Sequence, residues 1–162
     1  MNQEHIIKQL HEWMVEFLEQ PDPFLGNWPP CPYARQARIN NKIDIRFSEV
    51  EDLSFAINNC LPVLDEKDVV IICFDHNKIE PKQLQKIVKE QNTYLLPNNY
   101  VILEDHPYAV EFVNGLLMNF NYCGLLLIQK ADKLKHASEQ LKSKGYYDVW
   151  GQQELDEVVN WR

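Results

Sequence analysis

The sequence predicts an α+β fold of two layers, in which a four-stranded sheet carries helices mainly on one face. Four short segments have the apolar or alternating pattern of strands, and amphipathic helical segments separate most of them. The length of 162 residues suits one domain. The order of elements fits a ferredoxin-like β-α-β-β-α-β arrangement if one helix is inserted between the second and third strands. A small open α/β sheet is the alternative.

The chain is expected to begin with a helix and a proline-rich loop. Apolar residues recur at three- and four-residue spacing over 3–19, which gives a helix with one apolar stripe. Residues 20–38 contain five prolines, which exclude a long helix or a central strand. We therefore assign 1–20 to an N-terminal helix and 21–40 to an extended loop with a helical turn near its end.

The predicted α+β core occupies residues 41–145. Clean alternation of apolar and polar residues over 43–47 indicates its first strand. Ser48 is placed to cap a helix over 49–61, with a glutamate three residues later as in a capping box. The near-continuous apolar run at 68–74 indicates a central strand that is covered on at least one face.

The second half of the core is predicted by the same patterns. Pro81 suits the first turn of a helix, and residues 100–104 form the third strand. Residues 107–119 fit either a short helix or a loop leading into a hairpin. The apolar segment 123–129 is the fourth strand, and a helix follows over 132–143.

The C-terminal segment 146–162 is rich in aromatic residues. It contains Tyr146, Tyr147, Trp150 and Trp161. A tail of this composition is expected to pack back on the domain or on a second copy of it. The whole chain, 1–162, is therefore one domain with an aromatic tail.

Composition excludes several classes of function. Sixteen Lys and Arg residues against 24 Asp and Glu give a net charge of −8, which argues against general nucleic-acid binding and against binding to anionic membranes. Only five glycines are present, and neither GxGxxG nor GxxxxGK[ST] occurs. No nucleotide-binding motif is therefore recognised.

The N-terminus and the cysteines indicate a cytoplasmic protein. The first residues lack the positive region and unbroken apolar core of a signal peptide, and no apolar run approaches the ~20 residues that cross a bilayer. The four cysteines include no CxxC pair, which excludes zinc ribbons and thioredoxin-like motifs. Cys60, Cys73 and Cys123 are interpreted as buried apolar residues.

Two predicted strands end in the same way, with Asp75-His76 and with Asp105-His106. If these strands are parallel neighbours, both pairs project from one edge of the sheet. They could then form an acid/base pair or a divalent metal site, in which His76 and His106 would be the ligands. If the strands are antiparallel, the pairs lie at opposite ends. Asp and His also occur at strand ends because they bond the local backbone.

The proline-rich loop provides a second candidate. Cys31 lies between prolines, and a helical turn after it would place the thiol near a helix N-terminus and near Arg35. Both features lower a thiol pKa and favour a nucleophilic thiolate. Arg35 and Arg38, with Tyr33 nearby, could instead bind a carboxylate or phosphate. The alternative is that Cys31 is a buried plug and that the aromatic residues pack the loop on the sheet.

Two short motifs resemble a family of uncharacterised bacterial α+β proteins. These proteins have a Cys-Pro-aromatic-Ala turn after their first helix, as in CPYA at 31–34, and a later Phe-His-Pro segment, comparable to HPYAVEF at 106–112. The chain departs from that pattern at Asp105, where the family has an aromatic residue. The resemblance implies that Cys31 and His106 belong to one site, and it implies no reaction.

Two functional hypotheses follow. The first is a small-molecule site near the Cys31 loop and the two Asp-His strand ends, for a small polar or anionic ligand. In it His106 would be the acid or base, Asp75 or Asp105 would orient the imidazole, and Cys31 would be nucleophile or ligand, with or without a divalent metal. The second is a non-catalytic interaction module, a homodimer that associates through the aromatic tail and the first helix.

Overall fold

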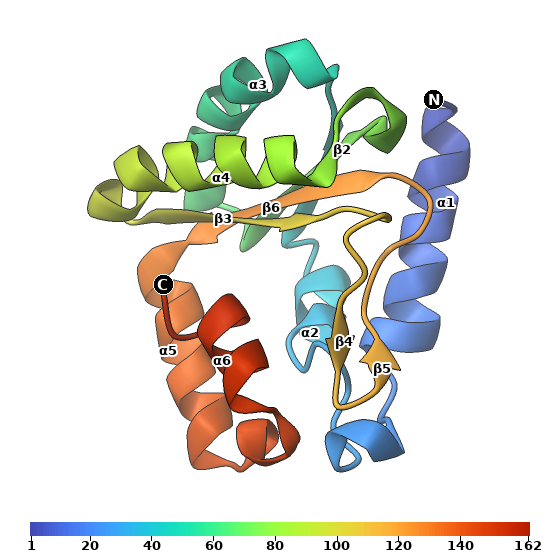
Figure 1. The fold of residues 1–162 in the computed structure, drawn as a ribbon, viewed down its shortest axis with the longest axis vertical. Coiled ribbons are helices and arrows are strands. Elements are labelled where there is room, and N and C mark those ends of the chain that lie inside the picture. Colours follow the sequence, from blue (N-terminus) through green and yellow to red (C-terminus); the bar gives the residue numbers. More distant parts are fainter.

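The computed structural model, which describes residues 1–162, has an α+β architecture with a four-stranded mixed sheet, a separate two-stranded sheet and six α-helices (Figure 1). The α+β prediction is confirmed. The strand order in the large sheet is β1-β2-β6-β3. Its strands are β1 Ile43–Phe47, β2 Val69–Phe74, β3 Tyr100–Asp105 and β6 Gly124–Lys130.

Three strands of the sheet run in the same direction. β1 and β2 are parallel neighbours, and β6 is antiparallel both to β2 and to β3. The connections β1–β2 and β2–β3 each contain a helix, as parallel strands require. The ferredoxin-like topology is not confirmed, because the first two strands pair in parallel and the last strand lies between β2 and β3.

Helices cover both faces of the sheet, so the prediction of two layers with helices mainly on one face is wrong. The strongly apolar β2 explains this arrangement, because its alternate side chains face opposite sides and both sides need cover. Ile72 and Phe74 belong to one core cluster with residues of α3 and α4, whereas Ile71 and Cys73 belong to a second cluster with residues of α1. These helices are α1 Gln3–Trp13, α3 Leu53–Cys60 and α4 Pro81–Leu95.

Helix starts differ from expectation at one position. Ser48 does not cap a helix: its hydroxyl donates to the carbonyl of Glu49, and a single 3-10 turn, Val50–Asp52, precedes α3. The capping box occurs instead at α4, where the Glu80 and Gln83 side chains bond each other's backbone N–H groups. Proline at the first turn of α4 suits the same helix start.

The outer edge of β3 is closed by a side chain rather than by another strand. Asn92 of α4 is buried, and its amide both donates to the Ile102 carbonyl and accepts from the Ile102 N–H, at 2.9 Å each. These are the two bonds that a neighbouring strand would make. The contact fixes α4 on the sheet and removes part of an exposed strand edge.

The remaining segments form a lower part of the molecule below the sheet (Figure 1). The ambiguous segment 107–119 is a loop with a small hairpin, and the aromatic tail packs on its own chain. Tyr146 is 3% exposed and donates to the Pro30 carbonyl at 2.6 Å. The elements are α2 Ala34–Ile39, β4 Phe112–Val113, β5 Leu116–Leu117, α5 Ala131–Ser143 and α6 Gln152–Val158.

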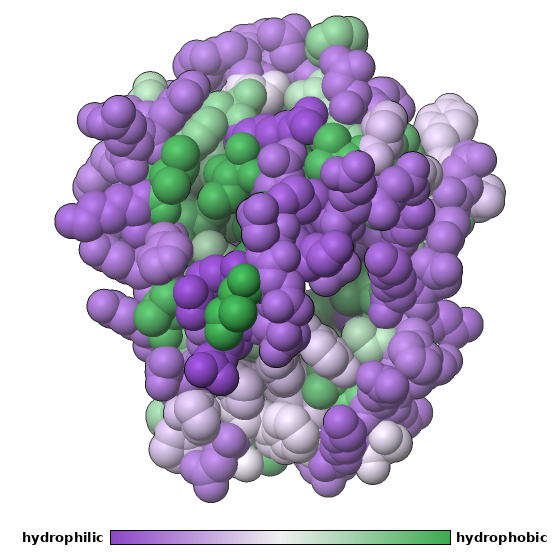
Figure 2. Space-filling model, turned by 180° about the vertical axis from the view of Figure 1, so that it is seen from behind, coloured by the Kyte–Doolittle hydropathy of each residue, from purple (hydrophilic) through white to green (hydrophobic).

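The surface seen from behind is predominantly hydrophilic, and hydrophobic side chains lie there in separate clusters (Figure 2). None of the helices has both the length and the apolar character that crossing a bilayer requires.

Candidate functional site

The two Asp-His pairs lie at the same edge of the sheet. β2 and β3 are not neighbours, but both are antiparallel to β6 and therefore end on the same side. The His76 and His106 rings meet at right angles with centroids 5.9 Å apart. β1 is parallel to β2 and ends at this edge too. The segments that follow β1, β2 and β3 together form the candidate site, which is called the carboxyl edge below.

His106 is a structural residue of this edge. It is 2% exposed, and both ring nitrogens are engaged. The Tyr108 N–H, 3.1 Å away, can only donate, so Nδ1 must accept. The proton therefore lies on Nε2, which donates to the Ile79 carbonyl at 2.9 Å. With neither nitrogen free, His106 does not provide the acid, base or metal ligand expected from the sequence.

Asp105 also holds the fold. One carboxylate oxygen accepts from the Asn119 amide at 2.6 Å, and the other accepts from the Phe120 N–H at 2.7 Å. Burial raises the pKa of the Asp105 carboxyl, and these two hydrogen bonds oppose that shift. Asp105 points to this network and not to an imidazole nitrogen, so it does not orient a catalytic histidine.

Asn119 is the centre of the loop that follows β3. The residue is 6% exposed, and its amide also donates to the carbonyls of His106 and Ala109 and accepts from the Glu111 N–H at 2.7 Å. One side chain thereby joins both ends of the loop that carries His106. No sequence pattern marks this role, because asparagine in a loop is common and its partners lie up to 14 residues away.

His76 differs from His106 because its ring nitrogens have no hydrogen-bond partner in the protein. The ring is partly buried and lies edge-on to Tyr108, with centroids 5.0 Å apart. Burial, and secondly the neighbouring His106, lower the pKa of His76, whereas Asp75 opposes the shift. His76 is therefore a neutral imidazole at neutral pH, with one nitrogen able to accept a proton.

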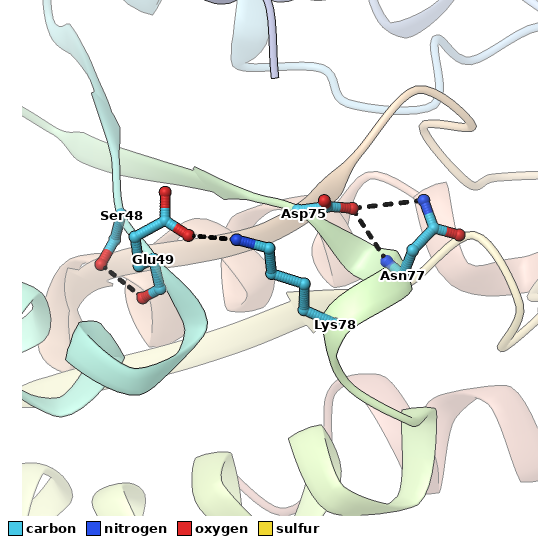
Figure 3. A network of polar contacts seen from close by, with 5 residues as sticks. All are labelled: Ser48, Glu49, Asp75, Asn77 and Lys78. Atoms are coloured by element: carbon cyan, nitrogen blue, oxygen red, sulfur yellow. Dashed lines mark hydrogen bonds and ion pairs between the residues drawn. The ribbon is translucent and has the colours of Figure 1, made fainter.

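A polar network links the ends of the strands (Figure 3). Asp75 accepts from the Asn77 N–H and side-chain NH2, at 3.0 and 3.2 Å, and the Tyr108 hydroxyl donates to the side-chain Oδ1 of Asn77 at 2.7 Å. The hydrogen bonds from Asn77 lower the pKa of Asp75. Lys78 forms an ion pair with Glu49, which follows β1. The segment carrying His76 is thus tied to the ends of both other parallel strands.

A cavity of about 340 Å³ opens at the end of β1. It is large enough for a small molecule. Arg46 and Lys78 are the cations of this region, and each is already paired, with Asp44 and Glu49 respectively. Asp52 and Asp75 have no cationic partner within ion-pair distance. The lining residues are Arg46, Phe47, Ser48, Glu49, Asp52, Phe55, Ala56 and Asn59.

Cys31 lies in a different environment. Its N–H donates to the Leu18 carbonyl at 2.9 Å, and it forms no hydrogen bond with His76 or His106. Burial raises the pKa of its thiol, and the N–H groups of Tyr33 and Ala34 lower it less than burial raises it. The expected lowering of the pKa is therefore wrong. Cys31 is a protonated thiol at neutral pH, and its side chain is only partly buried, unlike those of the other three cysteines.

The residues expected to bind an anion are largely occupied. Arg38 forms a two-pronged ion pair with the buried carboxylate of Glu19, at 2.6 and 2.8 Å. Tyr33 donates to α5 at the Ala137 carbonyl, 3.4 Å away. Arg35 is exposed and has no ion pair. Arg38 is thus held by Glu19, and Tyr33 joins the proline-rich loop to α5 while its side chain stays exposed.

The side chains at the carboxyl edge do not assemble a metal centre. No group of three or more His, Cys, Asp or Glu side chains is placed to hold a metal ion. Cys60, Cys73 and Cys123 are fully buried, as predicted.

Comparisons with known proteins identify no relative of this chain. No family model matches the chain, and no curated protein or solved structure shows significant similarity to it.

Proposed function

We propose that the chain binds a small polar molecule at the carboxyl edge of the sheet and that the free imidazole nitrogen of His76 accepts a hydrogen bond from it. The observation that carries the proposal is a partly buried imidazole with no partner, at an edge where three strands end. Ligands of open α/β sheets bind outside the carboxyl ends of the strands. The cavity beside Glu49 offers space for such a ligand; His76 does not line it, but the Lys78–Glu49 ion pair joins the cavity to the segment that carries His76.

The charges of this edge favour a ligand that donates hydrogen bonds, as an amine or alcohol does. The two nearby cations are paired, whereas the carboxylates of Asp52 and Asp75 have no cationic partner. A neutral His76 also accepts rather than donates at its free nitrogen. An anion at this edge would be repelled by the unpaired carboxylates of Asp52 and Asp75. A cationic or neutral ligand is therefore preferred to the anionic ligand that the sequence suggested.

The test is an amide NMR titration with two probes of similar size and opposite charge, ethanolamine and glycolate. We expect saturable shifts with ethanolamine at 46–49 and 75–78, and no saturable shift with glycolate at these residues. His76→Gln should weaken ethanolamine binding, whereas His136→Gln, which alters an exposed histidine of α5, should not. Absence of saturation, or equal binding by the His76 variant, contradicts the proposal.

A homodimer is the second candidate, and one observation favours it. The segment after β3 exposes five large apolar side chains, and three of them, Tyr108, Val110 and Phe112, precede the turn of the small hairpin. The remaining two are Leu117 and Tyr122. The proposed interface is this segment and not the aromatic tail, because the tail packs against other residues of its own chain.

Sedimentation velocity tests this candidate. A concentration-dependent dimer that dissociates in Phe112→Ser supports it, because that side chain is exposed and its loss leaves the fold intact. The matched control is Phe55→Ser, which removes an exposed phenylalanine of α3. A monomer at all concentrations excludes the dimer.

A further inference from the structure

A second cavity, of about 310 Å³, lies between α5 and the C-terminal segment. α5 follows the C-terminal end of β6, and β6 is antiparallel to β2 and β3, so this cavity lies on the side away from the carboxyl edge. α5 and α6 lie side by side there (Figure 1). The lining residues are Lys135, Ser138, Glu139, Lys142, Tyr147, Leu155, Val159, Asn160 and Arg162.

The cavity is cationic in an acidic protein. Three of its lining side chains are cations, Lys135, Lys142 and Arg162, against one carboxylate, that of Glu139. None of the three forms an ion pair, whereas the nearby Lys133 and Lys130 are both paired with aspartates. Three unpaired cations around one hollow repel one another, and a bound anion would remove that repulsion.

Arg162 provides an independent observation. Its Nη2 donates to the Ser138 hydroxyl at 3.1 Å, but its Nε is buried and has no hydrogen-bond partner. Burial lowers the pKa of its guanidinium, and the adjoining Tyr147 opposes this shift. A partly buried guanidinium without a counterion is costly, and proteins ordinarily pair such a group with a carboxylate or phosphate.

The opposite wall is apolar. Leu155 and Val159 lie one turn apart on the C-terminal segment, and the Tyr147 ring adjoins them in the lining. We propose that this cavity binds a small organic anion. Its carboxylate or phosphate group lies among the three cationic side chains, and its apolar part packs on Leu155 and Val159. Neither the ligand class nor the residues coincide with those of the carboxyl edge.

The first experiment is an amide NMR titration of the full chain at low ionic strength with phenyl phosphate, benzoate and the neutral benzyl alcohol. We expect both anions to produce saturable shifts on α5 and α6, and the tighter of the two identifies the headgroup. Benzyl alcohol should not saturate. If it binds as tightly as the anions, or if neither anion saturates, the inference is wrong.

Variants locate the site. Lys135 and Lys142 are exposed, so the double variant Lys135→Gln/Lys142→Gln should remain folded and lose at least about tenfold in affinity for the tighter anion. The matched control, Lys133→Gln/Lys144→Gln, removes the same charge from α5 and its end outside the cavity. Equal loss in both variants would show general charge attraction and overturn the site. Ethanolamine binding at the carboxyl edge should be unchanged in both.

Discussion

Asn119→Ala is expected to lower the free energy of unfolding by about 2–4 kcal/mol. The substitution removes the amide that holds the partly buried carboxylate of Asp105 and leaves the Glu111 N–H without its acceptor. Removing one partner of a buried charged group is among the most destabilising single changes, because the other partner stays desolvated. Urea denaturation followed by circular dichroism measures the loss.

The matched control is Asn98→Ala. Asn98 is exposed, and its amide makes one local bond to the Tyr94 carbonyl. Its replacement should change the free energy of unfolding by no more than about 0.5 kcal/mol. Equal effects of the two substitutions would show that the Asp105–Asn119 network does not hold the loop after β3.

The two histidines of the carboxyl edge are expected to respond differently to replacement. His106→Ala should lower the free energy of unfolding by about 2–4 kcal/mol, since it leaves the Ile79 carbonyl and the Tyr108 N–H unpaired and opens a buried space. His76→Ala should cost less than about 1 kcal/mol, because its nitrogens have no partners to lose.

Paired urea denaturation curves of the two variants give this comparison directly. If His76→Ala lowers the free energy of unfolding more than His106→Ala does, then His76, and not His106, is the histidine that holds the fold, and the account is contradicted. Both variants replace a histidine by alanine, so the difference between them reports the surroundings of each ring.

The elements of the fold were largely predictable because their signals are local. The alternation of 43–47 and the apolar run of 68–74 correspond to β1 Ile43–Phe47 and β2 Val69–Phe74. Their arrangement was not predictable in the same way. A run that is apolar on both faces, as β2 is, requires helices on both sides, but no local pattern says which helix covers which face.

The site was predictable only in part, for a physical reason. Asp75-His76 and Asp105-His106 could be placed at strand ends from sequence, and the structure brings them to one edge. The role of each ring depends on distant partners, such as the Ile79 carbonyl that accepts from His106. The direction of the Cys31 pKa could not be predicted, because the desolvation that raises this pKa outweighs the backbone N–H groups that favour the thiolate, and the sequence does not report desolvation.

The central claim is that His76 is the free hydrogen-bond acceptor of the carboxyl edge. Ring-nitrogen NMR of the five histidines, recorded between about pH 4 and pH 9, tests it most directly. The account predicts that His76 titrates below the ordinary histidine value of about 6.5, and that His106 carries its proton on Nε2 at neutral pH. A His76 that titrates at or above that value, or a His106 that is protonated on Nδ1 instead of Nε2, would contradict the account.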